Sequence, residues 1–413
     1  MNYEFFLARR IISTKQDKSS ISSSIIKIAI VAIALSIAVM IITIAVGVGF
    51  QRKVKEKISG FNGHVVITNF EDNNSQITVN PVSMNQPFYP EFTDVSGIKN
   101  VQTFATKAGI IRTPTDFEGI IFKGVNRDYD WSFFKEYLLA GKLLTITEET
   151  TNDVLISNTT ARRLGFKVGD TFNTFFMKEA NMNTAPNARV FKVAGIFDTG
   201  FEEFDETYVI GDIKQVQRLN KWEPDQVGGF EVLLDNFDQL EQKGREIYSN
   251  TPSTLNAQTI AVKYQPVFEW LNLLDVNVIV IIAIMVLVAG INMITALLVL
   301  ILERTQMIGI LKSLGSTNLS IRKIFLYNAG YLIFIGLLWG NLLGIIILLI
   351  QHYTGIVKFP NPENYYLKTI PVYLHWGYIV LLNIGTLILC LLMLLAPSYI
   401  VSRISPVKAI KFD

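Results

Sequence analysis

Cysteine and histidine are almost absent from this chain of 413 residues. The single cysteine, Cys390, excludes a disulfide within the chain and a metal site built on cysteines. The three histidines, His64, His352 and His375, are scattered, which argues against a zinc site or a histidine-dependent active site. Neither GxxxxGKS nor GxxxxGKT occurs, so the chain has no P-loop for the phosphates of ATP. We therefore expect no metal, no cofactor and no catalytic residue on this chain.

Charged residues are missing from four long apolar runs, at residues 28–50, 276–302, 325–350 and 376–401. Each run is long enough to cross a bilayer as a helix, which takes about 20 apolar residues. The first run is longer than the apolar part of a cleaved signal peptide, so we expect a retained anchor. Spans without ionisable residues argue against a proton- or ion-coupled carrier. If the protein does work, the energy must come from a partner.

The net charge of +2 is unevenly divided along the chain. Residues 51–270 carry 23 Lys and Arg against 29 Asp and Glu, a net −6, whereas the remainder carries 14 against 6, a net +8. Basic residues gather before the first apolar run, after the second and after the fourth, which places these three segments in the cytoplasm if there are four spans. The acidic region then lies outside the cytoplasm, and nothing indicates nucleic-acid binding.

The region 51–270 is long enough to form its own core and mixes strand and helix patterns. We expect strands near 64–68, 101–105 and 119–124, and a helix at 158–164. A middle subdomain, roughly 125–200, is expected inside an outer one. The fold class is therefore an α-helical membrane protein with four transmembrane helices plus a large α+β extracytoplasmic domain inserted between spans 1 and 2.

The chain changes character abruptly after the second apolar run. Met307, Ile310, Leu311 and Leu314 recur at i, i+3, i+4 and i+7, which predicts one apolar stripe on a short helix. Gly315 follows at the position of a helix C-terminal cap. The pattern leaves two interpretations open: a helix that lies on the lipid headgroups, or a coupling helix that a separate motor protein binds.

A family resemblance decides between them. The string LLVLILERTQMIGILKSLGS resembles the lipoprotein-releasing ABC transporter permeases of the LolC/LolE family, within the wider group of macrolide-efflux and FtsX-like permeases. MNYEFFLARRII, the LGFKVGDTF turn, NYYLKTIPV and the final SPVKAIKFD are also similar to that family. The resemblance extends over nearly the whole chain. It favours a membrane-resting N-terminal helix over a loose tail at the start of the chain.

The resemblance implies a permease dimer in the bacterial inner membrane, made with a second copy or a paralogue. Two ABC ATPase subunits on separate chains would bring ATP and Mg. The complex would extract lipoproteins from the inner membrane and pass them to a periplasmic carrier. The implied segments are a cytoplasmic amphipathic helix 1–24, transmembrane helix 25–50, extracytoplasmic domain 51–270, transmembrane helix 271–302, coupling helix 303–323, transmembrane helix 324–351, extracytoplasmic loop 352–375, transmembrane helix 376–401 and cytoplasmic tail 402–413.

Candidate sites follow from the same resemblance and from the apolar pattern. Near the outer-leaflet end of the first two spans, lipoprotein acyl chains are expected between Val46, Phe50, Asn277 and Ile281. The residues expected to contact the ATPase are Glu303, Arg304, Met307, Gly309, Ile310, Leu311, Lys312, Leu314 and Gly315.

The third span carries Gly336, Gly340 and Gly344 at intervals of four residues. Such a stripe lets another helix backbone approach closely, although glycine is also simply frequent in membrane helices.

Two features of the large domain remain open. The loop 175–189 is expected to protrude between two strands, with Met177, Met182 and Pro186 as candidates for docking the carrier; the alternative is an ordinary loop without a partner. The acidic cluster 202–206 lacks the spacing of a calcium loop, and we expect a solvated face.

Two other function classes stay open. One is a mechanotransmission permease for efflux or for activating a cell-wall hydrolase, and the other is a membrane scaffold without transport. The efflux relatives usually carry a fused ATPase domain, and the cell-division relatives have a much smaller extracytoplasmic domain.

Overall fold

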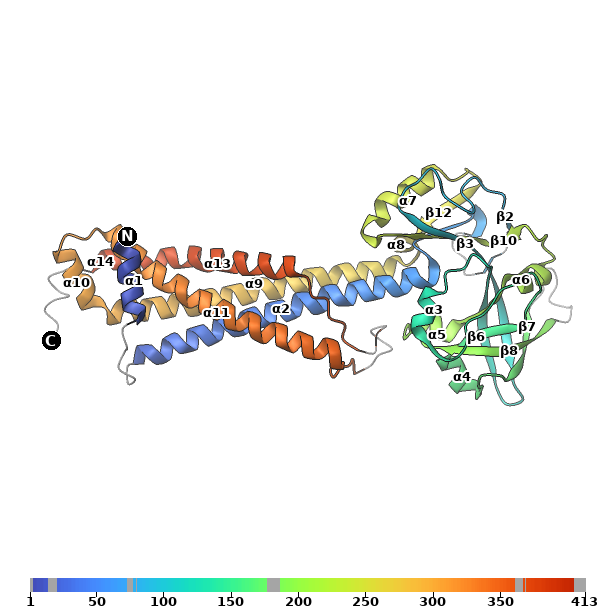
Figure 1. Cartoon of the computed structure of the whole chain (residues 1–413), viewed down its shortest axis with the longest axis horizontal. Helices are drawn as coiled ribbons and strands as arrows, with labels where there is room; N and C mark the ends of the chain where they lie inside the picture. Colours follow the sequence, from blue (N-terminus) through green and yellow to red (C-terminus); the bar gives the residue numbers. More distant parts are fainter. Residues whose placement is uncertain are drawn as a thin grey trace. The chain divides into compact units, whose positions relative to one another are not determined.

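The computed structural model contains two compact units (Figure 1). One comprises residues 1–51, 270–357 and 369–413, and the other comprises residues 52–269 and 358–368. We call them the helical unit and the α+β unit and describe each by itself. The residues that the structure describes are 3–13, 21–72, 77–78, 80–176, 186–360, 367 and 369–404.

The helical unit is built around four long apolar helices. These are α2 (Ile21–Asn62), α9 (Gln265–Glu303), α11 (Asn318–Thr354) and α13 (Trp376–Ser398), and each is long and apolar enough to cross a membrane. Their number confirms the prediction of four membrane helices, counted over the described residues. Because lipid offers no hydrogen-bond partners, a helix that satisfies its own backbone is the expected form of each apolar run.

Among the described residues, three short helices complete this unit: α1 (Tyr3–Ser13), α10 (Thr305–Ser313) and α14 (Ile400–Arg403). Pro397 lies just before the end of α13, and the chain continues as α14 after Tyr399. Thr317 caps the start of α11 by accepting a hydrogen bond from the Ser320 N–H.

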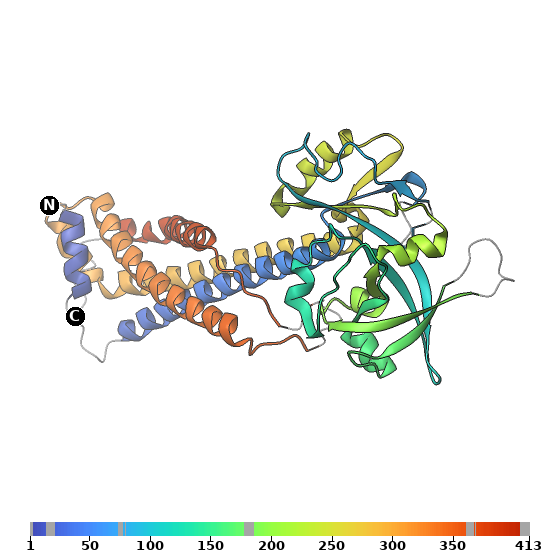
Figure 2. The ribbon, with the colours of Figure 1, turned by 45° about the vertical axis from the view of Figure 1, so that its right-hand side comes forward.

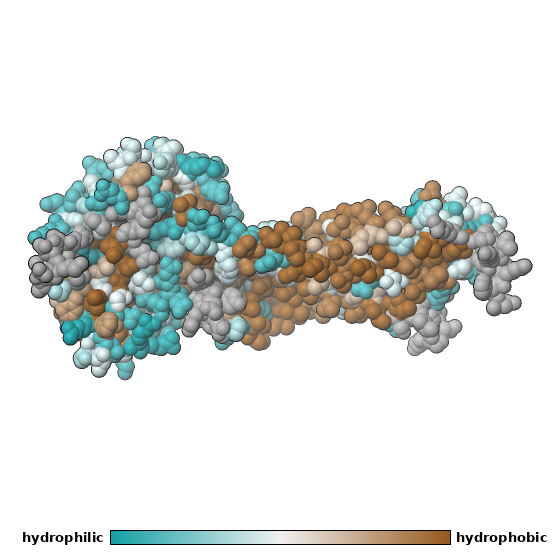
Figure 3. All heavy atoms as spheres, turned by 180° about the vertical axis from the view of Figure 1, so that it is seen from behind, coloured by the Kyte–Doolittle hydropathy of each residue, from teal (hydrophilic) through white to brown (hydrophobic). Residues whose placement is uncertain are grey.

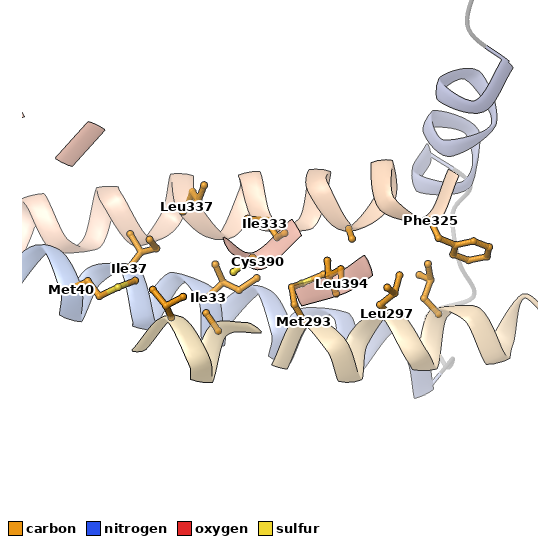
Figure 4. Packing of buried hydrophobic residues seen from close by; sticks show 14 of the residues in the cluster. Ile33, Ile37, Met40, Met293, Leu297, Phe325, Ile333, Leu337, Cys390 and Leu394 are labelled. Atoms are coloured by element: carbon orange, nitrogen blue, oxygen red, sulfur yellow. The ribbon is translucent and has the colours of Figure 1, made fainter. Parts of the chain in front are cut away.

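A continuous hydrophobic cluster joins the long helices. Ile37 and Met40 of α2 pack with Met293 of α9, Ile333 of α11 and Cys390 of α13 (Figure 4). On the face shown in Figure 3, the surface of these helices is mostly hydrophobic, whereas that of the α+β unit is largely hydrophilic. The buried cluster stabilises the bundle, and the apolar outer surface fits a lipid environment.

The α+β unit contains one extended sheet with helices packed around it (Figure 2). The order of the main path is β12-β1-β11-β3-β4-β9-β6-β8-β5, with β7 paired to both β3 and β8. A separate pair joins β2 (Val82–Ser83) and β10 (Gln226–Val227). The other bounds are β1 Val65–Asn69, β3 Ile98–Arg112, β4 Phe117–Val125, β5 Leu138–Gly141, β6 Asp153–Ser157, β7 Thr171–Phe176, β8 Asn187–Phe197, β9 Tyr208–Asp212, β11 Gly229–Leu234 and β12 Leu255–Thr259.

Six of these strands close into a ring. The sequence β3-β4-β9-β6-β8-β7 returns to β3 through the antiparallel pairing of β3 with β7. Phe122, Phe176 and Phe191 contact one another in the core of this ring, with ring centroids 5.0 to 6.2 Å apart. Residues 125–200 supply three of the six strands, β6, β7 and β8, whereas β3, β4 and β9 come at least partly from outside that range.

Helices cover the remaining faces of this unit. The predicted helix at 158–164 is present as α4 (Asn158–Leu164), and it ends at Gly165, which has a φ of 75°. The other helical segments are η1 Phe70–Asp72, α3 Ser132–Tyr137, α5 Glu202–Thr207, α6 Ile213–Asn220, η2 Phe237–Gln239, α7 Leu240–Ser249 and α8 Ile260–Lys263. The mixture of strands and helices confirms the α+β class.

Candidate functional site

The short helix α10 lies at one end of the helical unit. Its predicted apolar stripe is divided between a face packed on the bundle and an exposed face. Met307 and Leu311 pack against the hydrophobic cluster, together with the fully buried Ile308. Ile310 and Leu314 are 49% and 78% exposed. The prediction that all four residues share one outward face is therefore wrong, because the bundle covers two of them.

The outward face of α10 has a different composition from the predicted one. It carries Gln306 and Ile310, with Leu314 following as the C-cap residue, all exposed, and we call these three residues the exposed α10 face. They are spaced by four residues and so lie along one side of the helix. Apolar side chains dominate this side although water surrounds it in the isolated chain, which is typical of a surface that binds another protein.

The other residues predicted for this site have different surroundings. Glu303 is exposed, Arg304 is half-buried and Gly309 is buried. Gly315 adopts a φ of 91°, the left-handed conformation that commonly ends a helix. Lys312 donates hydrogen bonds to backbone carbonyls at residues 401, 402 and 404, and burial lowers the pKa of its ammonium group. Lys312 is thus held inside its own chain and does not line the rim of the exposed α10 face.

The N-terminal helix α1 packs beside the first turns of α11 (Figure 1). Ser320 donates a 2.8 Å hydrogen bond to Glu4, and the ring of Phe5 meets the ring of Tyr327 edge-on at 6.0 Å. Ala8 is buried, so α1 has one face against α11 and one exposed face. Phe5 and Phe6 are exposed on this helix.

Gly336, Gly340 and Gly344 of α11 lie against α2. A Cβ atom at Gly340 would come within 2.6 Å of the Ala34 carbonyl oxygen, and one at Gly336 within 2.6 Å of the Ile33 side chain. At Gly344 the nearest atom, the Cα of Ala38, would be 3.3 Å away. The two backbones therefore approach at a distance that excludes larger residues at the first two positions.

The four positions expected to meet acyl chains differ in exposure. Phe50 is only 5% exposed and packs edge-on against Trp270 at 5.5 Å, and Val46 is partly buried against the hydrophobic cluster. The expectation that Phe50 offers a receiving surface is wrong, because its ring fills the space between α2 and α9. Asn277 and Ile281 are exposed on α9.

Polar contacts that the sequence did not reveal connect the membrane helices. Gln51 donates to the Asp275 carboxylate at 2.7 Å and to the Leu271 carbonyl at 3.1 Å, which joins α2 to α9. Asn341 and Asn383 exchange hydrogen bonds of 2.7 and 2.9 Å between α11 and α13. The only sequence signal for this pair was that neutral amides stand out in charge-free spans.

The structure describes the two ends of the loop 175–189. Met177 and Met182 lie outside the described residues. β7 ends at Phe176 and β8 begins at Asn187, and these two residues pair directly, so the two strands form an antiparallel hairpin. Pro186 is exposed.

The acidic segment 202–206 is a helical turn rather than a solvated face. Asp205 is 4% exposed and accepts hydrogen bonds from the N–H and hydroxyl of Thr199 and from the Gly200 N–H. Burial raises the pKa of Asp205 to about 6. The prediction of a solvated face is wrong for this carboxylate, which accepts the hydrogen bonds that hold the turn after β8.

Within the described ranges, no three His, Cys, Asp or Glu side chains are grouped closely enough for a metal ion.

Comparison with known proteins places these features in a family. A model of the MacB-like periplasmic core domain matches residues 28–248, more than half of the chain, and a model of the FtsX-like permease C-terminal domain matches residues 279–406. The chain is 22% identical to the lipoprotein-releasing system transmembrane protein LolE of Haemophilus influenzae, over 99% of both chains. It is 23% identical to LolC of the same organism, over 80% of this chain and 83% of the relative. The extracellular domain of the ABC-type transporter YknZ aligns with a TM-score of 0.32 at 14% identity over 47% of this chain and 99% of that domain, too low to carry an argument.

Proposed function

The chain belongs to the LolC/LolE family within the FtsX-like permeases, and from this premise we propose that it extracts lipoproteins from the inner membrane and hands them to a periplasmic carrier. The observation that carries the proposal is the match to a lipoprotein-releasing permease over 99% of both chains. The four membrane helices and the α+β unit are both included in that match, so the resemblance is not limited to one shared module.

An ATPase on a separate chain would drive this work, because the sequence contains no P-loop. We propose that it binds the exposed α10 face, where Ile310 and Leu314 are exposed apolar side chains. Burying this surface in a protein groove is favourable, since it removes apolar area from water. The ATP and Mg would be bound by the partner.

The acyl chains of the substrate would meet the exposed side of α9 near Asn277 and Ile281. Extracting a lipoprotein exposes acyl chains, at a cost of about 0.8 kcal/mol for each CH₂ that leaves the bilayer. A receiving surface must therefore be apolar, as the exposed residues of α9 largely are. A second permease copy or a paralogue would complete this surface.

The sidedness follows from charge. The basic segments around α1, α10 and the chain end would face the cytoplasm, and the α+β unit would face the periplasm. This orientation puts the exposed α10 face on the side where ATP is available.

Depletion of the protein in its own organism tests the proposal. Lipoproteins destined for the outer membrane should accumulate in the inner-membrane fraction as the protein disappears. Re-expression of the chain should restore their distribution. If the lipoproteins sort normally while drug sensitivity or cell separation changes, the efflux or cell-division class of permease is the correct one.

A further inference from the structure

Two basic residues after the second membrane helix contact the end of the fourth. The Lys312 ammonium, on α10, donates to the carbonyl oxygens of Val401, Ser402 and Ile404 at 2.9, 3.3 and 2.8 Å. A lysine ammonium has three donors, and here three backbone acceptors are within reach of it.

Arg322, in the second turn of α11, contacts the same helix end from another side. Its Nε donates to the Ser398 hydroxyl at 3.2 Å, and its Nη2 donates to the Leu395 carbonyl at 3.4 Å. Its guanidinium also lies 5.7 Å from the centre of the Tyr399 ring. Ser398 is fully buried, so this contact is part of the packed interior.

The chemistry of a helix end explains why two cations gather here. The last carbonyls of a helix have no partner within the helix, and they carry the negative end of its dipole. Apolar packing adds to the polar contacts, because Val401 and Ile308 are both fully buried in the same cluster. The end of the fourth helix is therefore bound to α10 and α11 by side chains, although α10 adjoins only α9 and α11 along the chain.

We propose that Lys312 is a positioning residue that makes α10 and the α13–α14 end move as one body. This inference rests on the proposed function, in which an ATPase displaces α10. Through Lys312, that displacement reaches the fourth membrane helix directly, and not only the two helices that α10 connects along the chain. Without Lys312, α10 can move while α14 stays behind.

A distance measurement on the purified chain tests the connection itself. In a Cys390→Ala background, spin labels at Gln306→Cys on α10 and Ile400→Cys on α14 report the separation of two exposed positions. We expect one narrow distance distribution, and a broadened or shifted one after Lys312→Met, which keeps an apolar side chain of similar length but removes the donors. Lys323→Met, at an exposed lysine in the second turn of α11, removes the same charge and should leave the distribution narrow. An unchanged distribution in Lys312→Met overturns the proposal.

A second measurement uses the complex with its ATPase. The readout is lipoprotein released per ATP hydrolysed, which a role in assembly alone would not change. We expect a severalfold lower ratio for Lys312→Met, recovery with Lys312→Arg because a guanidinium can also donate to several carbonyls, and the wild-type ratio for Lys323→Met. A wild-type ratio in Lys312→Met contradicts the positioning role. If the wild-type complex hydrolyses ATP and releases no lipoprotein, the proposed function fails, whereas the spin-label result still decides the connection.

Discussion

At the scale of single residues, the α+β unit contains a buried ion pair at the end of α2. Lys123 on β4 and Glu231 on β11 are each 2% exposed, with Nζ and Oε1 2.6 Å apart. Lys123 also donates to the Phe61 carbonyl near the C-terminus of α2, and Gln102 donates to the second oxygen of Glu231 at 2.8 Å. Burial lowers the pKa of Lys123, and the nearby Glu231 carboxylate opposes this. Three strands are thereby connected to one helix end.

Removing one member of this pair should destabilise the protein strongly. Lys123→Met leaves Glu231 buried without its counter-ion, which typically costs about 3–5 kcal/mol of the free energy of unfolding. The double variant Lys123→Met with Glu231→Leu should recover much of that loss, since no isolated charge remains. Thermal unfolding of the full chain in detergent measures both. Lys99→Met, which removes a partly exposed partner of Asp130, is the control and should cost about 1 kcal/mol or less. If Lys123→Met lowers the free energy of unfolding by no more than the control does, this account is contradicted.

At the scale of elements, α10 shows what a periodic pattern determines and what it leaves open. The i, i+3, i+4, i+7 spacing correctly predicts a short helix ending near Gly315. It does not determine which neighbour covers each apolar residue, because the four side chains spread over an arc of about 100° around the helix. Only the packing of α10 on the bundle separates the two pairs.

Because Ile310 is exposed and Leu311 packs on the bundle, the same substitution at these two neighbouring residues of α10 should have different effects. Ile310→Asp places a charge on the exposed α10 face and should abolish co-purification of the ATPase while the yield of folded permease stays normal. Leu311→Asp places the same charge against the hydrophobic cluster and should lower the yield of folded permease itself. Leu139→Asp, at a 59% exposed position of the α+β unit, serves as a control for the substitution. Normal ATPase binding by Ile310→Asp would remove this face from the proposed interface.

The four membrane helices could be predicted from the sequence, but the contacts between them could not. A charge-free run of this length has few alternatives to a membrane helix, which is why all four runs were identified from the sequence. The burial of Phe50 against Trp270 and the contacts of Lys312 with residues 401–404 join parts of the chain more than 80 residues apart. The sequence carries no local signal of such pairings. The glycine stripe indicated a close helix approach, but it did not name α2 as the neighbour.

At the scale of the whole molecule, the strand topology depends on long-range pairing in the same way. Strands near 64–68, 101–105 and 119–124 could be expected from β-branched and aromatic residues. The closure of six strands through β3 and β7 could not, because register and order are determined by distant partners. The family match over both the membrane helices and the α+β unit is what connects this architecture to lipoprotein release.

Reconstituted release tests the central claim most directly. The permease is placed in proteoliposomes together with the ABC ATPase proposed as its partner and a triacylated lipoprotein, and a periplasmic extract is added as the acceptor. We predict that lipoprotein appears in the soluble fraction only when ATP is hydrolysed, and that the same protein without its acyl chains does not stimulate the ATPase. Sustained ATP hydrolysis that leaves all lipoprotein in the membrane would contradict the account.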